Sequence, residues 1–201
     1  GSDTPRRSSL VISFFDMVIR ERGSLYVLGD LFDFWANNRQ LIRSHRAVFS
    51  KLGEFAARGL TAGLLIGNRD FLLSRRTLAD CGVGFLGEEA EIALDGKRIF
   101  LAHGHTLCLS DTQFLKYKQR MWPLFRILDR LLPGSIENRI ARRFILQSKK
   151  IINAQDPSRF AFTREAIDRL FTAGIDVVIC GHTHKPEQYQ AGEKRFFALP
   201  A

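Results

Sequence analysis

The chain has no long apolar run, few cysteines and no internal repeat. None of its apolar stretches approaches the roughly 18–20 residues that cross a bilayer, so no transmembrane helix is expected. Its three cysteines lack Cys-x-x-Cys spacing, which is typical of ordinary thiols in a reducing compartment. The opening residues, GSDTPRRSS, show no signal-peptide pattern. These absences favour a cytoplasmic location.

The chain is basic, and its excess charge is concentrated in one segment. The formal net charge is +9 over 201 residues, a length that predicts a single domain over residues 1–201. Residues 116–150 hold ten Lys or Arg against two acidic residues, whereas the rest of the chain is close to balanced. This distribution favours a local element facing an anion or a membrane, and we expect no nucleic-acid partner.

Short apolar runs of strand type alternate with segments of helical periodicity. The pattern predicts helices over 8–22, 38–58, 74–80 and 163–174. It predicts buried strands over 24–30, 61–68 and 176–182, and hairpins over 91–104 and 189–199. Strands buried on both faces, alternating with helices and followed by hairpins, indicate an α/β sandwich. Residues 110–155 interrupt this order with a long helical block, broken at Pro133-Gly134, and are predicted to be an insertion.

Polar side chains of the kinds that bind metals follow the ends of the predicted strands. Functional groups of open α/β sheets gather at the carboxyl ends of strands. Any one such residue is weak evidence, and His103 alone would more often be a hydrogen-bonded buried histidine. Together they form a set of donors that suits Mn, Fe or Zn, because imidazole favours transition metals. The set comprises Asp30, Asn68, His103, His105, His182 and His184.

Four motifs occur in the order typical of the calcineurin-like metallophosphoesterases: GDLFDFW (29–35), GNRDFLL (67–73), HGHTLCLSD (103–111) and GHTHKP (181–186). In detail they resemble one branch of that family, the UDP-2,3-diacylglucosamine hydrolases of lipid A synthesis. Arg69 matches this branch, whereas most members of the family have His at that position. The resemblance runs essentially end to end. It implies a four-layer α-β-β-α sandwich with a helical lid at about 110–155. It also implies hydrolysis of the substrate's pyrophosphate bond to UMP and 2,3-diacylglucosamine 1-phosphate (lipid X).

The same resemblance implies a site for two divalent transition-metal ions, with manganese expected. Asp30 would bridge the two ions. Asn68, His103 and His182 would complete one site, His184 would join Asp30 at the other, and Asn68 and His182 are also expected to be catalytic. Two such ions can share a nucleophilic hydroxide and stabilise charge on the phosphoryl oxygens. Arg69 would bind the pyrophosphate through its rigid fork of donors.

The first motif of the family, Asp-x-His, does not occur in this sequence. Asp3-Thr4-Pro5 has proline where histidine is needed, and the helix predicted over 8–22 is the element that follows this motif in relatives. Our hypothesis is that a first strand is missing upstream of residue 1. The final residues, FFALPA, stop inside an expected strand, which agrees with a chain shortened at both ends. Without the motif, the second metal site would keep only Asp30 and His184.

Further residues are assigned to the substrate by the resemblance. Asp111 occupies a polar position beside the substrate, and Phe114 stands where relatives often have Tyr. MWPLFRILDRLL (121–132) alternates apolar bulk with Arg, as interfacial helices do. It would supply an apolar groove for acyl chains and a contact with the membrane surface, and Phe125, Ile127 and Leu128 are the predicted lid contacts. A solvated helical face and a nucleic-acid patch are the alternatives for this basic block.

Four other polar residues have predicted roles outside the metal site. Asp33 and Asp70 are expected to orient loops or histidines. His105, where the branch more often has Asp, is expected to be an outer-shell group more than a ligand, and His45 is predicted to lie on the surface of an amphipathic helix.

Two other functions remain open. The first is a phosphodiesterase or phosphatase of the same fold with an unacylated substrate, and the second is a non-catalytic scaffold. The leading interpretation is a cytoplasmic monomer, peripherally associated with the inner membrane, that acts on an acylated nucleotide sugar.

Overall fold

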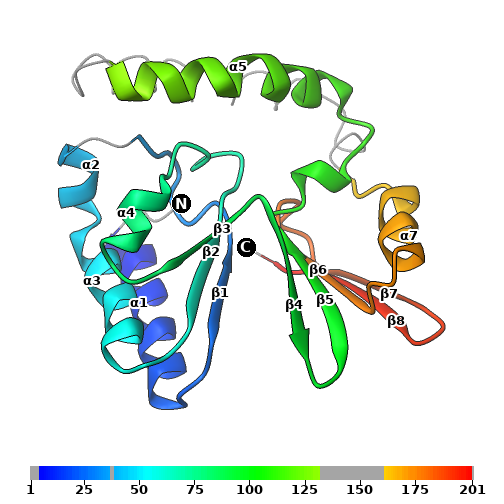
Figure 1. Ribbon diagram of the computed structural model, residues 1–201, viewed down its shortest axis with the longest axis horizontal. Helices are drawn as coiled ribbons and strands as arrows, with labels where there is room; N and C mark the ends of the chain where they lie inside the picture. Colours follow the sequence, from blue (N-terminus) through cyan, green and yellow to red (C-terminus); the bar gives the residue numbers. More distant parts are fainter. Residues whose placement is uncertain (1–4, 37–38, 132–160, 201) are drawn as a thin grey trace.

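The computed structural model describes residues 5–36, 39–131 and 161–200, which form two β-sheets with helices on their outer faces (Figure 1). The layers follow one another as helices, a three-stranded sheet, a five-stranded sheet and a further helix. This arrangement confirms the predicted α-β-β-α sandwich.

The three-stranded sheet is parallel, with strand order β1-β2-β3. Its strands are β1 (Leu25–Leu28), β2 (Ala62–Leu65) and β3 (Gly84–Gly87). The first two were predicted, and β3 was missed because its sequence, GFLG, has two glycines and too few apolar residues to indicate a strand. β1 and β2 pair along their full length, so the loops that carry Asp30 and Asn68 leave the sheet side by side.

Four helices lie in the half of the chain that forms this sheet: α1 (Pro5–Arg20), α2 (Arg39–Ser44), α3 (Arg46–Ala57) and α4 (Arg75–Ala79). The single helix predicted over 38–58 is therefore two helices, because the chain turns at His45, where φ is −105° and ψ is 15°.

The prediction that His45 lies on the surface was wrong. Its side chain is buried, with the ring 4.6 Å from Phe32, and its Nδ1 lies 3.0 Å from the Leu41 carbonyl oxygen. The amphipathic pattern gave no sign of the break between α2 and α3, and that break turns the ring into an aromatic cluster with Phe32, Trp35 and Phe49.

The five-stranded sheet is mixed, with strand order β4-β5-β6-β8-β7. Both predicted hairpins are present, and the parallel strand β6 lies between β5 and β8. The strands are β4 (Glu89–Leu94), β5 (Lys97–Ala102), β6 (Val177–Cys180), β7 (Glu187–Ala191) and β8 (Lys194–Ala198). Helix α7 (Arg164–Thr172) covers the outer face of this sheet (Figure 1).

Three apolar clusters match the spaces between the layers. One joins α1 and α3 to the first sheet, and a second joins α7 to the second sheet through Ile167, Phe171 and Phe196. A third, smaller cluster around Leu65, Ile99 and Leu101 fills the space between the two sheets. The sheets therefore pack face to face, which brings the loops after β1 and β2 against the loops after β5 and β6.

A short helix, η1 (His105–Leu107), and the long helix α5 (Thr112–Leu131) follow β5. Helix α5 crosses the end of both sheets, where the predicted lid was expected (Figure 1). The predicted break at Pro133-Gly134 and the rest of the block to residue 155 lie outside the described residues. Across the described part of the chain, no helix has both the length and the apolar character needed to span a bilayer.

Candidate metal centre

Asp30 lies where the loops after β1 and β2 cross closely. Gly29 and Asp30 both adopt left-handed backbone conformations, with φ of 79° and 52°. A Cβ atom on Gly67 would lie 2.2 Å from Asp30 Oδ1, so only glycine permits this approach. The backbone N–H of Arg69 donates to the same oxygen at 2.9 Å. The two loops therefore fix the position of the Asp30 carboxylate.

Asp70 connects the same two loops through hydrogen bonds to the backbone of each. Its carboxylate is fully buried and accepts hydrogen bonds from the Gly67 N–H at 2.7 Å and the Leu31 N–H at 2.9 Å. Burial, together with the nearby negative charge of Asp30, raises the pKa of Asp70 to about 7, although the backbone donors oppose this. Asp70 thus orients loops, as predicted.

Arg69 is held beside Asp30 by two carboxylates. Its Nε lies 3.3 Å from Asp30 Oδ2, and its Nη1 donates to Asp33 Oδ1 at 3.2 Å. The side chain is 40% exposed, so the guanidinium is oriented from one side and open to solvent on the other. This arrangement leaves donors that can bind an anion.

His103 links the two sheets and faces the other predicted ligands. Its Nδ1 lies 2.8 Å from the Leu28 carbonyl oxygen, which can only accept a hydrogen bond, so Nδ1 carries a proton. In the neutral ring, Nε2 therefore presents a lone pair. This nitrogen lies 2.8 Å from Asn68 Oδ1 and 3.5 Å from Asp30 Oδ2.

His182 completes the cluster from the loop after β6. Its Nδ1 lies 3.2 Å from His103 Nε2, and its backbone has a left-handed φ of 73°. A non-glycine residue in this region is uncommon, and such strain concentrates at functional sites. Burial lowers the pKa of His182 to about 3, and the neighbouring histidines and Arg69 act in the same direction. The ring is therefore neutral at pH 7 and has a lone pair for a ligand.

His184 stands at the edge of the cluster. Its backbone is also left-handed, with φ 58°, and its side chain is exposed. Burial and the charge of Arg69 lower the pKa of His184, while Asp30 raises it. Both charged groups are thus within electrostatic reach of this ring.

The model of the calcineurin-like phosphoesterases matches residues 2–186. The chain belongs to this family. It is accordingly a metal-dependent hydrolase.

Two curated relatives of this phosphoesterase are named UDP-2,3-diacylglucosamine hydrolase. The protein from Photorhabdus laumondii is 35% identical over 81% of this chain and 69% of its own length. That from Ralstonia nicotianae is 35% identical over 88% of this chain and 71% of its own length. Among solved structures, an archaeal phosphodiesterase gives a TM-score of 0.45 at 13% identity, covering 97% of this chain and 78% of the other.

The cluster of the phosphoesterase fits the divalent cation that the family implies. His103 Nε2, Asn68 Oδ1 and Asp30 Oδ2 are all acceptors when the His103 ring is neutral, yet His103 Nε2 lies 2.8 Å from the amide oxygen and 3.5 Å from the carboxylate oxygen. His182 Nδ1, 3.2 Å from His103 Nε2, joins this set in the tautomer that carries its proton on Nε2. Acceptors repel at such distances unless a cation stands between them, and two donors on one transition metal lie about 3 Å apart. Within the described ranges, no three His, Cys, Asp or Glu side chains alone could hold a metal ion, so the fit depends on the Asn68 amide.

The lowered pKa of His182 predicts that the stability of the metal-free phosphoesterase depends on pH. An unfolded imidazole titrates near about 6.5, whereas the folded ring stays neutral down to about pH 3. The unfolded state binds more protons between these values, so stability falls as the pH drops through this window. We expect a loss of about 2 kcal/mol between pH 7 and 5, measured by urea unfolding. His182→Asn should remove this part of the dependence, and an unchanged dependence would contradict the assignment.

Apart from Arg69, the predicted substrate residues lie on helix α5 or, for Asp111, immediately before it. Asp111 is buried, and its Oδ1 accepts a hydrogen bond from the Phe114 N–H at 3.1 Å, so it caps the helix. Phe125 packs on Phe71 with ring centroids 6.2 Å apart, and Leu128 is partly buried. Ile127 points outward and is 54% exposed. Their contacts with substrate stay predictions.

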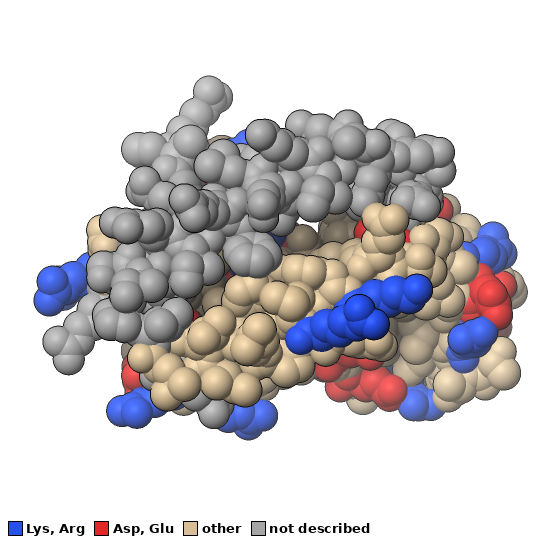
Figure 2. All heavy atoms as spheres, turned by 90° about the horizontal axis from the view of Figure 1, so that it is seen from above, with Lys and Arg blue, Asp and Glu red and all other residues tan. Residues whose placement is uncertain are grey.

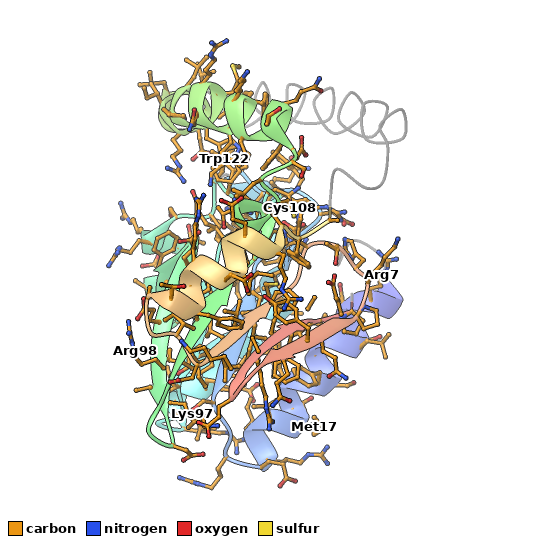
Figure 3. The ribbon with its side chains drawn as sticks, turned by 90° about the vertical axis from the view of Figure 1, so that its right-hand side faces the viewer. Arg7, Met17, Lys97, Arg98, Cys108 and Trp122 are labelled. Atoms are coloured by element: carbon orange, nitrogen blue, oxygen red, sulfur yellow. The ribbon has the colours of Figure 1, made fainter. Side chains whose placement is uncertain are left out.

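Three residues beside the cluster were missed in the sequence: Glu88, Lys118 and Trp122. Trp122 is buried on the inner side of α5, and its ring stacks on Phe71, with ring centroids 4.4 Å apart and an interplanar angle of 12°. Figure 3 shows Trp122 between α5 and the body of the molecule. The spacing of Lys118, Trp122 and Phe125 at four and three residues could have indicated this inner helical face.

Proposed function

We propose that this phosphoesterase hydrolyses the pyrophosphate bond of UDP-2,3-diacylglucosamine to UMP and 2,3-diacylglucosamine 1-phosphate, within lipid A biosynthesis. The similarity to hydrolases of that name, at 35% identity over more than four fifths of the chain, carries this proposal. The convergence of Asn68, His103 and His182 supports the chemistry, since a metal-dependent hydrolase needs such a set of neutral donors.

In this proposal Asp30, Asn68, His103 and His182 hold one divalent ion, and His184 joins Asp30 at a second, with manganese the expected metal at both. The ions would activate water and neutralise charge on the phosphoryl oxygens. Arg69 binds a phosphate oxygen through the donors that Asp30 and Asp33 leave free. Buried Asp70 keeps the loops of Asp30 and Asn68 in register.

The two faces of helix α5 support the proposal that the substrate is acylated and that the protein contacts the inner membrane peripherally. Its inner face is aromatic, with Trp122 and Phe125, whereas Leu124, Ile127 and Leu131 are exposed on another face. Figure 2 shows one band of Lys and Arg side chains near the middle of this face and further basic groups at its rim, where acidic side chains also lie. Apolar side chains bordered by basic ones are typical of helices that lie in a lipid interface. The proposal is of a monomeric, cytoplasmic enzyme with no nucleic-acid partner.

Replacing Phe125, Ile127 and Leu128 together by Asp is expected to lower kcat/KM for the acylated substrate at least tenfold more than for a small phosphodiester. Three charges on the lid would oppose burial of acyl chains, which gain about 0.8 kcal/mol per buried CH₂. Leu94→Asp is the matched control, because Leu94 is 58% exposed on the β4–β5 hairpin. Equal losses on both substrates would argue against a lipid-binding lid.

The proposed activity is tested with purified protein loaded with Mn²⁺. Release of UMP from UDP-2,3-diacylglucosamine is compared with hydrolysis of bis(p-nitrophenyl) phosphate and of UDP-N-acetylglucosamine, which has no long acyl chains. A preference of at least a hundredfold for the diacylated compound is expected. Similar rates on all three would indicate a general phosphoesterase, and no turnover despite bound metal would indicate a scaffold.

A further inference from the structure

His105 is a buried imidazole without a hydrogen-bond partner. Its side chain is 1% exposed, and neither Nδ1 nor Nε2 has a partner within hydrogen-bond distance in the described structure. The ring lies against His103, Phe114 and Trp122, with centroid separations of 5.5, 5.6 and 5.6 Å. A buried polar group left unpaired is costly, so this position needs a partner in some other state of the molecule.

Glu88 is the nearest group that can become that partner. It lies between β3 and β4, and its Oε2 is 3.6 Å from His105 Nε2, just beyond hydrogen-bond range. The same oxygen accepts a hydrogen bond from the Lys118 ammonium group on α5, and this bond fixes it at a distance from Nε2 that is too long for a hydrogen bond to the ring. Glu88 and Lys118 are 28% and 17% exposed, so the pair is largely shielded from solvent.

The contact between Lys118 and Glu88 is one of those that dock α5 on the body of the molecule. Another is the stack of Trp122 on Phe71, which follows β2. Lys118 Nζ also lies 5.0 Å from the centroid of the Trp122 ring, so the two contacts adjoin each other. A movement of α5 away from the sheets would break both together and would leave Glu88 without its cation.

We propose that Glu88 is a positioning residue that exchanges partners: it binds Lys118 when α5 is docked, and it accepts a hydrogen bond from the His105 Nε2–H when α5 lifts. The exchange needs a shift of Glu88 by less than one ångström toward the ring, within the range of a side-chain adjustment. It gives the carboxylate a new donor when it loses the ammonium group. It also fixes the tautomer of His105 beside His103.

The exchange links the position of the lid helix to the hydrogen bonding of a ring that lies beside His103. It rests on contacts within this chain, and it stands whichever phosphate ester the enzyme hydrolyses. No metal or substrate is therefore needed to test it.

The test uses Trp35→Phe protein, in which Trp122 is the one remaining tryptophan of two. In this background Lys118→Met is expected to lift α5, so the acrylamide quenching constant of Trp122 should rise at least threefold. Lys116→Met is the control, because Lys116 is exposed on the same helix. Circular dichroism checks that each variant is folded. Quenching of Lys118→Met protein equal to that of the control would overturn the role of the Lys118–Glu88 pair.

The second readout follows the His105 ring by long-range ¹H–¹⁵N correlation spectra. In Lys118→Met protein we expect the pattern of an Nε2-protonated ring with a hydrogen-bonded Nε2–H. Adding Glu88→Ala should abolish the hydrogen-bonded signal while the quenching of Trp122 stays high. A His105 spectrum that does not change when Glu88→Ala is added to Lys118→Met would overturn the exchange, even if α5 has lifted.

Discussion

Asn68→Ala is expected to lower hydrolysis by roughly 100- to 1000-fold, because the cluster loses the amide oxygen that we propose as a metal ligand. Asn68 Oδ1 lies 2.8 Å from His103 Nε2, so the amide stands among the proposed imidazole and carboxylate ligands. The dissociation constant for Mn²⁺, measured by titration calorimetry, should rise by at least tenfold.

The stability of the metal-free protein separates this effect from unfolding. Removing one acceptor from a group of acceptors relieves repulsion, so the free energy of unfolding without metal should change by less than about 1 kcal/mol. Gln188→Ala is the control, since Gln188 is an exposed amide on β7. Activity and metal affinity within threefold of the parent protein would remove Asn68 from the proposed ligand set.

Gly67→Ala is expected to destabilise the protein by about 3 kcal/mol and to abolish most of its activity. The added methyl group would lie 2.2 Å from Asp30 Oδ1 and 2.6 Å from the Asp30 backbone nitrogen. These neighbours cannot yield without breaking the bonds from Arg69 and Asp70 that hold the two loops. Thermal unfolding and the hydrolysis rate would both register the displacement of Asp30.

Gly53→Ala provides the matched control for this substitution. Gly53 lies within α3, and a Cβ atom there would meet only the Cys81 carbonyl oxygen at 3.6 Å, an ordinary contact. Alanine in a helix interior is favoured over glycine by up to about 1 kcal/mol, so this variant should be as stable as the parent or more so. A Gly67→Ala protein that unfolds at the same temperature as Gly53→Ala would show that the loops can separate without cost.

The proposed exchange of Glu88 between Lys118 and His105 predicts a further result for the Asn68→Ala protein. Burial by itself would raise the pKa of Glu88, but the proximity of His105 and Lys118 outweighs burial and keeps this pKa at about 2, so the carboxylate is ionised. The docked pair is therefore intact at neutral pH, and variants of the metal centre leave it unchanged. Loss of activity in Asn68→Ala protein should consequently occur without any rise in the quenching of Trp122.

The sequence by itself determined the order of the elements and the identity of the clustered groups. The strand runs are long and apolar enough to predict β1, β2, β5 and β6, and the polar residues that follow them are Asp30, Asn68, His103 and His182. This works because the carboxyl ends of strands gather functional groups, so one-dimensional position implies proximity. Strand β3 was not predicted, because its two glycines weaken the local strand pattern and only its pairing with β2 stabilises it.

Tertiary structure alone decided which nitrogen faces which oxygen and what lies beneath α5. His45 was predicted to lie on the surface, yet it is buried, because burial depends on how distant segments pack. The burial of His105 beside Trp122 was likewise not evident from the sequence. The pairing of Glu88 with Lys118 joins residues 30 positions apart, and Trp122 meets Phe71 across 51 positions. Such contacts form only when α5 folds back over both sheets. No periodicity within a single segment encodes that step, since its energy comes from surfaces that the sheets present after they have assembled.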